Sequence, residues 1–387
     1  MVQSGLEAEA LEVYHHVPSV SAFDLVVSPV HLGPKNSVLV EARMRGKKII
    51  THHQAVGEIL LPILDPEIEV MEVTGTHSKT STALLTARII SHHKKVLSHT
   101  TRGLELWENG KARLLETGMS ITPGNVIPAL EAATASRARL LIAEVSLGGT
   151  GLCNFGVLTS LSGDYHIADG SKWASTAKLQ MLSLARDGSK LIANADALLS
   201  PDLSFSDGGQ IRVKPDRLIF KKVELPISLG EDLDYEGYRV ALAGAAAAAA
   251  AEGVDKETIA MAMQGFDGFS GRMKIRRLVG STLYDNSNSG LKVRDVALAL
   301  DRARGTGLVV VVGEESETVC EGMDIPALSQ LLRQRRSEMA ALILVGQRLA
   351  PLAVELRALA AKNLVEGLEA AEVFHPERLL SCVKCFR

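Results

Sequence analysis

Residues 67–100 carry a strand pattern, a polar loop and a helix pattern in direct succession, which limits the fold of the chain more than any other feature. The segment EIEVMEVTG (67–75) predicts a buried strand, and TSTALLTARIISHH (80–93) has apolar residues at helical spacing. KKVLSHT (94–100) then predicts a second strand. This order forms one unit of an α/β fold with a largely parallel sheet, and the loop before such a helix is where phosphate groups bind.

The polar loop VTGTHSKTS (73–81) has the features of a phosphate-binding loop, with two exceptions. Backbone N–H groups at the start of the helix would point at an anion, Lys79 would neutralise phosphate charge, and the Thr80 hydroxyl would reach Mg²⁺. The strict pattern G-x-x-x-x-G-K-[ST] has glycine where this chain has Val73 and Ser78. A serine can replace the second glycine only if its φ is negative. On the loop alone, nucleotide binding and a strand–helix turn that contains a lysine are both open.

Further apolar segments continue the α/β pattern along the chain. Buried strands are predicted at RLLIAEVSL, FGVLTSL and SKLIANAD, and later at TLYDNS, GLVVVVGEE and AALILVGQ. Near the N-terminus, FDLVVSPV and GKKIITHH predict two strands of a small unit. The segment YRVALAGAAAAAAAEG (238–253) predicts a tightly packed helix that Gly253 ends. Changes of pattern near residues 68 and 273 predict domain boundaries there.

Composition excludes several classes of protein. The net charge is −3 and aromatic residues are 4% of the chain, so neither a basic field nor stacking groups indicate nucleic-acid binding. No apolar run is long enough to span a bilayer and the first twenty residues do not form a secretory signal, so we expect a cytoplasmic protein without membrane partners. The CVKC motif (382–385) has metal-ligand spacing, but a closed zinc site needs a second pair, which is absent from the sequence. The alternative is an incidental tail.

Three chemically active side chains follow predicted strands. Glu144 comes at the end of LLIAE, His166 follows LTSLSGDY, and Lys79 follows the strand before the loop. Strand ends at one edge of a parallel sheet converge on the ligand crevice. A carboxylate buried there must meet a cation, and beside a phosphate loop that cation would be Mg²⁺.

The loop and these strand ends resemble the Mur ligase superfamily, whose loop reads T-G-T-x-G-K-T-[ST] and has no first glycine. Members are ATP-dependent enzymes that activate a carboxylate as an acyl phosphate. The resemblance implies ATP and Mg²⁺ as cofactors, with metal contacts from Thr80, Glu144, His166 and a lysine, here Lys178, that is carbamylated in many members and bridges two metal ions. The family has aspartate and histidine adjacent, whereas Tyr165 separates them in this chain.

The same resemblance extends over residues 70–345. It implies ATP contacts from the loop and from later motifs, at Gly75, Thr76, His77, Ser78, Lys79, Thr80, Ser81, Asn194, Arg272, Asp285 and Asn286. It implies catalytic roles for Lys79, Glu144, His166, Lys178 and Arg272. The three-domain architecture would have a small N-terminal α/β substrate-recognition domain (1–68), a central P-loop domain (69–272) and a C-terminal Rossmann-like domain (273–387). The adenine-contacting asparagines of the family are absent, so base recognition would use Tyr238 or Arg239, unless these simply begin a packed helix.

Phrases outside the ATP motifs are similar to the Mur-like coenzyme F-430 synthetases of methanogenic archaea. They are SPVHL, ITHHQAV, HTTRG, ITPGNVI, EVSLGGTG and TVCEGMDI. The resemblance implies closure of a ring on a nickel tetrapyrrole acid, with nickel only as part of the substrate. Such a substrate carries several carboxylates and would need cationic clamps, for which the candidates are His31, His52, His53 and Arg102, with ordinary surface exposure as the alternative. Two other functions stay open, namely a Mur-like amide ligase and a non-catalytic member that binds nucleotide or tetrapyrrole.

Overall fold

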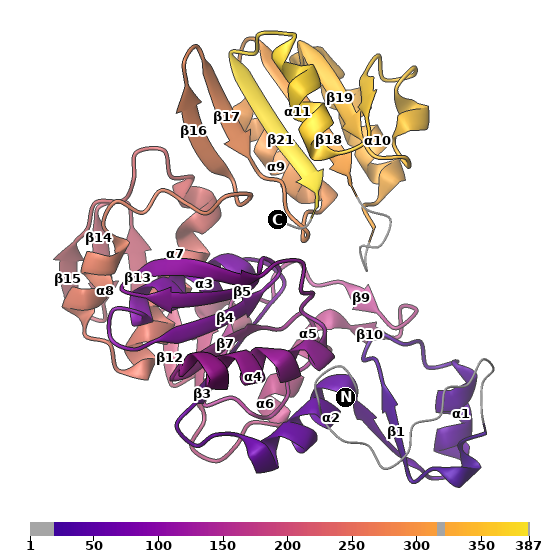
Figure 1. The fold of residues 1–387 in the computed structure, drawn as a ribbon, viewed down its shortest axis with the longest axis vertical. Coiled ribbons are helices and arrows are strands. Elements are labelled where there is room, and N and C mark those ends of the chain that lie inside the picture. The colour runs from indigo at the N-terminus through magenta and orange to yellow at the C-terminus, as the bar shows by residue number, and fades with distance from the viewer. Residues whose placement is uncertain (1–18, 316–321, 386–387) are drawn as a thin grey trace. The chain divides into compact units, whose positions relative to one another are not determined.

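The computed structural model describes residues 19–315 and 322–385, and its contacts divide the chain into two compact units (Figure 1). The first unit comprises Met1–Ile227 with Arg239–Met263, and the second comprises Ser228–Tyr238 with Gln264–Arg387. Residues 318–321 of the TVCEGMDI phrase and the first 18 residues of the predicted N-terminal domain lie outside the described part. The three-domain division made from the sequence stays a prediction.

The first unit begins with two parallel strands, β1 (Leu25–Ser28) and β2 (Lys48–Thr51), which confirm the two predicted N-terminal strands. Helices α1 (Ser37–Met44) and α2 (His52–Leu60) and the short turns η2 (Val20–Ala22) and η3 (Leu61–Ile63) accompany them. Alternate residues of β1 are buried, and its inner face packs against α1 in a small apolar cluster. Asn36 and Thr51 cap α1 and α2 by accepting backbone N–H groups, which fixes where each helix starts.

A sheet of eleven strands forms the body of the first unit, in the order β15-β14-β13-β12-β11-β8-β3-β7-β4-β5-β6 within the described residues. Its parallel centre consists of β12 (Leu203–Phe205), β11 (Lys190–Asn194), β8 (Phe155–Leu158), β3 (Glu69–Thr74), β7 (Leu140–Glu144) and β4 (Val96–Thr100). Further strands extend both edges: β5 (Gly103–Glu108) and β6 (Lys111–Glu116) follow β4 in antiparallel pairs. On the other edge β13 (Ile211–Lys214) pairs with β12 in parallel, and β14 (Arg217–Phe220) and β15 (Val223–Pro226) continue from it in antiparallel pairs. The predicted parallel sheet is confirmed, whereas these extensions are additions.

Helices cover both faces of this sheet. On one face α2 and α4 (Val126–Ser136, preceded by η4, Pro123–Asn125) bury apolar residues against β3, β4 and β7. Helix α3 (Lys79–Ile90) packs against the same strands through its own buried residues and contacts α8 (Lys256–Met263). The predicted alanine helix is α7 (Tyr235–Glu252), and residues 245–249 of it are completely buried. A Cβ at Gly244 would lie 3.2 Å from the Phe205 ring and from Thr82, so small residues are needed for this packing.

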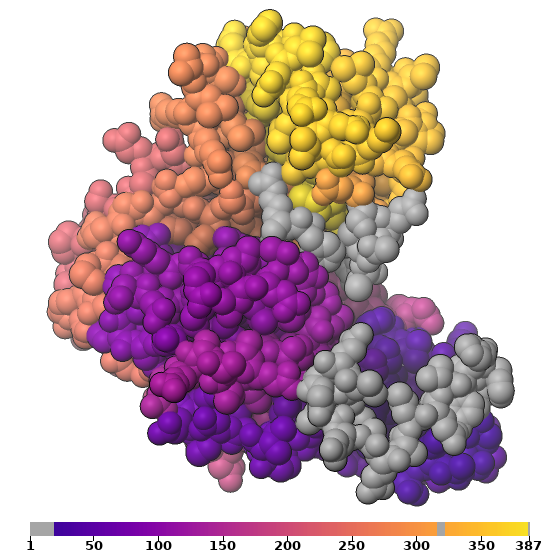
Figure 2. Space-filling view, in the orientation of Figure 1, coloured from indigo at the N-terminus to yellow at the C-terminus, as the bar shows by residue number. Residues whose placement is uncertain are grey.

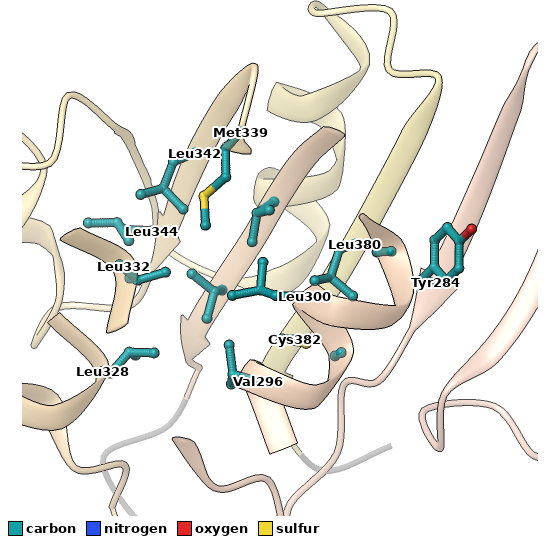
Figure 3. Packing of buried hydrophobic residues seen from close by; sticks show 14 of the residues in the cluster. Tyr284, Val296, Leu300, Leu328, Leu332, Met339, Leu342, Leu344, Leu380 and Cys382 are labelled. Atoms are coloured by element: carbon teal, nitrogen blue, oxygen red, sulfur yellow. The ribbon is translucent and has the colours of Figure 1, made fainter. Parts of the chain in front are cut away.

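The second unit has a six-stranded sheet in the order β16-β17-β21-β18-β19-β20. The strands are β16 (Lys274–Leu278), β17 (Ser281–Asp285), β21 (Arg378–Lys384), β18 (Leu308–Glu314), β19 (Ala341–Val345) and β20 (Leu359–Ala361), with β16 antiparallel to the parallel remainder. Helices α9 (Val293–Ala303) and α10 (Ile325–Arg335, followed by η6, Arg336–Glu338) pack on one face, and α11 (Leu364–Glu372) packs on the other; η7 (Ala350–Leu352) precedes β20. Figure 3 shows the apolar core between the sheet and helices α9 and α10, and Figure 2 shows the surface of the C-terminal residues in yellow.

The CVKC motif belongs to this sheet, so its interpretation as an incidental tail is wrong. Strand β21 lies between β17 and β18, in the centre of the sheet. Cys382 is buried in the core under α9 and α10, whereas Cys385 is buried in the core under α11. Because the two thiols face opposite sides of the sheet, they cannot bind one metal ion or form a disulfide with each other.

None of the helices in residues 19–315 and 322–385 has the length and hydropathy that crossing a bilayer requires.

The contact between α2 and the loop after β7 gives a test of the packing. A Cβ on Gly57 would overlap the backbone carbonyl oxygen of Thr150, whereas a Cβ on Gly124 would meet open space. We expect Gly57→Ala to lower the free energy of unfolding by roughly 1–3 kcal/mol, because neither backbone can move cheaply. Thermal unfolding with Gly124→Ala as the matched control measures the effect. Equal midpoints for the two variants would contradict the close contact.

Candidate active site

The loop between β3 and α3 is held against the end of β8. The Thr76 N–H donates to the Ser160 carbonyl at 2.9 Å, and its hydroxyl donates to the Ser162 carbonyl at 2.7 Å. A Cβ at Gly75, whose φ is 146°, would overlap the Thr159 hydroxyl, which explains the glycine at this position. The loop therefore has a fixed course, and it leads directly into the first turn of α3, whose N–H groups have no partner within the helix.

Ser78 differs from the expectation made for it. Its φ is 63° and its ψ is 3°, which is the left-handed conformation. The prediction that a serine at this position needs a negative φ is therefore wrong. The loop thus keeps the backbone shape of a glycine and accepts strain of about 1–2 kcal/mol. Neighbouring bonds stabilise this shape: the Ser78 carbonyl accepts the N–H and hydroxyl of Thr82, and the His77 ring bridges the Ser78 and Ser162 hydroxyls.

Thr80 and Glu144 meet at the start of α3. The Thr80 hydroxyl donates to Glu144 Oε2 at 2.8 Å, and the Thr101 N–H donates to the same oxygen at 3.3 Å. Both side chains are buried, and Val73 of β3 pairs with Glu144 of β7 in the parallel register. A hydroxyl and a carboxylate side by side are the donors that Mg²⁺ uses together with phosphate oxygens, so these two residues fit the predicted ion. Lys79 lies on the same turn and donates to the Gly75 carbonyl at 3.2 Å.

Asn194 joins two strand ends of the same sheet edge. Its amide donates to the Thr159 carbonyl at 2.8 Å, and its carbonyl accepts the Asp196 N–H at 3.3 Å, within the short turn η5 (Ala195–Ala197). The Ser160 hydroxyl in turn donates to Asp196 at 2.6 Å. This network fixes the end of β11 beside the phosphate loop, and a nucleotide contact by Asn194 stays a prediction. Ser81, also predicted to contact ATP, is half-buried in the first turn of α3.

His166 and Lys178 lie in the segment after β8. His166 begins β9 (His166–Ile167), which pairs with β10 (Lys172–Trp173), and its exposed ring stacks on Trp173 with centroids 3.7 Å apart. Lys178 ends α5 (Ala174–Lys178), before α6 (Gln180–Ser183), and is 1% exposed. Its Nζ donates to the Ser146 carbonyl at 2.6 Å and lies 5.8 Å from the centre of the Tyr165 ring.

Asp164 precedes these residues and holds the start of α5. It accepts the N–H groups of Tyr165 and Ser175 at 2.9 and 3.0 Å. Burial alone would raise the pKa of its carboxyl, but the hydrogen bonds from Ser175 and Tyr165 and the charge of Lys178 outweigh burial and lower the pKa. The carboxylate form of Asp164 therefore helps to balance the buried lysine.

The four predicted substrate clamps have different surroundings. His31 and His52 are exposed, and burial followed by the charge of His31 lowers the pKa of His52. His53 is buried beside Gly148, and burial lowers its pKa to about 4, which favours the neutral imidazole over the predicted cation. Arg102 forms a 2.9 Å ion pair with the buried Glu105. Substrate contact by these four residues stays a prediction.

The predicted residues of the second unit also form a connected group. The Gly271 N–H donates to Asp285 at 3.0 Å, and Arg272 donates to the Asn288 side chain at 3.1 Å. The Asn288 amide donates to the carbonyls of Gly271 and Asn286. The GFSGRMK segment is therefore fastened to the loop after β17, which places Arg272, Asp285 and Asn286 within one network.

Tyr238, proposed for base recognition, is 2% exposed, and its hydroxyl accepts the Phe269 N–H at 2.8 Å, as expected of a packed helix start. Arg239 donates to Asp207 at 3.1 Å.

Two further residues near the site, Glu72 and Thr101, were not predicted from the sequence. Glu72 is buried in β3 and accepts the N–H and hydroxyl of Thr150 at 2.9 and 2.5 Å, which anchors the Gly-rich loop after β7. Burial raises the pKa of its carboxyl despite these bonds. The signal for Glu72 was the one used for Glu144, a carboxylate within an apolar strand. Thr101 contacts Glu144 through its backbone N–H and Thr80 through its hydroxyl, at 3.4 Å, but a single threonine after a strand gave no signal in the sequence.

Comparisons with known proteins identify relatives of this chain. The family model described as the C-terminal domain of coenzyme F430 synthetase CfbE matches residues 275–385. A coenzyme F(430) synthetase of Methanosarcina acetivorans is 38% identical over 413 residues, covering 95% of this chain and 87% of that protein.

Solved structures show the fold. MurF from Acinetobacter baumannii has a TM-score of 0.59 and 16% identity and covers 87% of this chain and 78% of its own. A folylpolyglutamate synthase of Mycobacterium tuberculosis complexed with ADP has a TM-score of 0.59 and 13% identity, over 89% of this chain and 94% of its own. The predicted Mur-ligase-like α/β fold is confirmed.

The left-handed serine predicts the effect of two substitutions. Ser78→Gly removes the strain at φ 63° and should preserve or raise ATP turnover, by up to about tenfold if the strain of about 1.4 kcal/mol opposes the bound shape. Ser78→Ala keeps the strain and removes the hydroxyl together with its contact to His77, so it should turn over ATP no faster than the wild type. Steady-state measurement of ADP release compares the three proteins. A large loss in both variants would assign a role to the Ser78 hydroxyl instead.

His53 predicts a pH dependence of stability. Its pKa is about 4 in the folded protein, against 6.5 for an unperturbed histidine, so between these pH values the unfolded chain binds more protons. The contribution of the neutral, buried His53 to the free energy of unfolding is therefore complete above pH 6.5. It is lost as the pH falls towards 4, by up to about 3 kcal/mol. Denaturant unfolding at several pH values should show a smaller fall for His53→Gln, whereas His375→Gln, at an exposed position, should follow the wild type. Parallel curves for wild type and His53→Gln would be incompatible with this account.

Proposed function

Because the chain belongs to the coenzyme F430 synthetase family, we propose that it uses ATP to activate a propionate carboxylate of a nickel seco-tetrapyrrole acid and then closes a carbocyclic ring. A carboxylate oxygen bonds to the γ-phosphorus of ATP, and ADP leaves. A ring carbon, which loses a proton, then bonds to the acyl carbon of the resulting acyl phosphate, and inorganic phosphate leaves. Both the nickel and the reacting carbon belong to the substrate.

One observation carries the ATP-dependent step, namely the meeting of Thr80 and Glu144 beside Lys79 at the start of α3. Thr80 and Glu144 would hold Mg²⁺, which supplies positive charge to the phosphate oxygens when bound. Lys79 and the N–H groups of the first helical turn would stabilise the charge that develops on the transferred phosphoryl group. The arrangement supports phosphoryl transfer, in which positioning and electrostatic stabilisation are the main contributions of a protein.

The ring closure makes a different demand. Carbon–carbon bond formation within one molecule needs one side chain held against one ring atom. Such positioning can lower the activation free energy by ~7–11 kcal/mol. Residues 25–60 supply a separate small core beside the β7–α6 region, joined by the Thr51–Gln180 hydrogen bond of 3.0 Å. We assign recognition of the macrocycle to this part, with His31 and His52 as candidate partners of its carboxylates and His53 as a buried packing residue. Arg102, in the turn between β4 and β5, is a further candidate partner.

The amide-ligase alternative makes a different prediction about the acceptor. Purified protein is incubated with ATP, Mg²⁺ and the nickel seco-tetrapyrrole acid, with and without amino acids, and ADP and phosphate are measured. We expect release of both products with the acid alone. Release only when an amine is added would favour the amide ligase, and no release with any acid would favour the non-catalytic alternative.

Lys79→Ala tests the phosphate site directly. We expect turnover to fall by at least about 100-fold, because a charge that stabilises the transferred phosphoryl group is lost. Lys111→Ala, an exposed substitution on β6, is the matched control and should retain activity. Circular dichroism checks that both variants are folded. Near-normal turnover in Lys79→Ala would show that this loop does not bind the reacting phosphate.

A further inference from the structure

His166 and Lys178, two of the residues predicted to contact metal ions, face different sides of the β9–β10 hairpin. Ile167 packs with Ala174 and Ala177 of α5, the helix that ends at Lys178. Side chains alternate along a strand, so His166, the neighbour of Ile167, faces away from α5. Its exposed position and its stacking on Trp173, directly opposite in the register, agree with this direction. His166 therefore does not join Lys178 in this structure.

Tyr165 occupies the place beside Lys178 instead. It lies two residues before Ile167 and packs with the same cluster, and Lys178 Nζ is 5.8 Å from the centre of its ring. The face of an aromatic ring carries negative charge density and attracts a cation at this distance. A carbamate would place an anion against that face, so the ring favours the unmodified ammonium group.

The hydrogen bond of Lys178 points to the same chemical state. Its Nζ donates to the Ser146 carbonyl at 2.6 Å, the short distance typical of a charged donor. Asp164 lies at the start of the same helix, α5, and accepts the Ser175 N–H at 3.0 Å. A second metal ion bridged by Lys178 does not fit these residues.

We propose that Lys178 is an unmodified ammonium group that positions the loop after Glu144, and that the site binds a single divalent ion, at Thr80 and Glu144. Ser146 follows Glu144 by two residues, and the Val145 N–H donates to the Val73 carbonyl at 2.9 Å, so fixing Ser146 also fixes the direction of the carboxylate. Lys178 thus acts through Glu144 as a positioning residue. The inference rests on the proposed function only in taking ATP and a divalent ion as the ligands of the site.

Two measurements on the wild-type protein test the chemical state without any turnover. The full chain is equilibrated with isotopically labelled bicarbonate, and carbon nuclear magnetic resonance detects any lysine carbamate. Electron paramagnetic resonance then counts bound Mn²⁺ in the presence of a non-hydrolysable ATP analogue. Lys178→Met identifies any signal that belongs to this lysine, and Lys172→Met, at an exposed position on β10, is the matched control.

We expect no carbamate signal and one Mn²⁺ per chain in the wild type and in both variants. A carbamate signal that disappears only in Lys178→Met, or two Mn²⁺ per chain in the wild type, would overturn the inference. If the nucleotide analogue and Mn²⁺ fail to bind at all, the proposed function is wrong, while the labelling result still decides the state of Lys178.

Chemical rescue tests the positioning role separately. In Lys178→Ala, a small alkylammonium ion should enter the vacated space and raise turnover by about tenfold, the equivalent of about 1.4 kcal/mol for one charged hydrogen bond. A short carboxylate should have no such effect. Rescue by the carboxylate but not by the ammonium ion would mean that an anion is needed at this position, and absence of rescue by either in a folded variant would argue against a role for the charge.

Discussion

The hydrogen bond between Thr80 and Glu144 links the two elements on which the rest of the site depends. Thr80 belongs to the first turn of α3, and Glu144 ends β7, which pairs with β3 in parallel. The register of these two strands sets the height of the carboxylate relative to the helix start. A shift by one residue would turn Glu144 to the other face of the sheet. Packing of the sheet between α3 and α4 therefore determines the geometry of a site made of only a few polar atoms.

Much of this arrangement could be predicted because it follows from hydrophobic pattern and strand direction. The runs around Val73, Glu144 and Asn194 are apolar on both sides, as expected of strands covered by helices on two faces. Parallel strands bring their carboxyl ends to one edge, which is why the residues after β3, β7 and β11 lie near one another. The prediction of the second-unit group around Arg272 and Asp285 depended on recognised motifs, since no periodicity connects the two segments.

Other features could not be predicted, for reasons that are local and physical. The conformation of Ser78 is imposed by its neighbours Thr82 and His77, and propensity alone favours negative φ for serine. The direction of His166 depends on the alternation of a two-residue strand, which is too short to leave a pattern in the sequence. The edge strands β13, β14 and β15 are half exposed, and their short runs resemble loops. Burial of His53 results from the close approach of Gly148, a contact between segments far apart in the chain.

Strand β21 has a consequence for how the second unit is assembled. It separates β17 from β18, although α9 is the only helix between those two strands in the sequence. These earlier strands therefore cannot pair with each other, and each keeps an open edge until a segment more than sixty residues after β18 is inserted. Long-range pairing of this kind raises the contact order and slows folding. Until that insertion, the valine-rich edge of β18 is open to pairing with other chains, so a delay in this step favours aggregation.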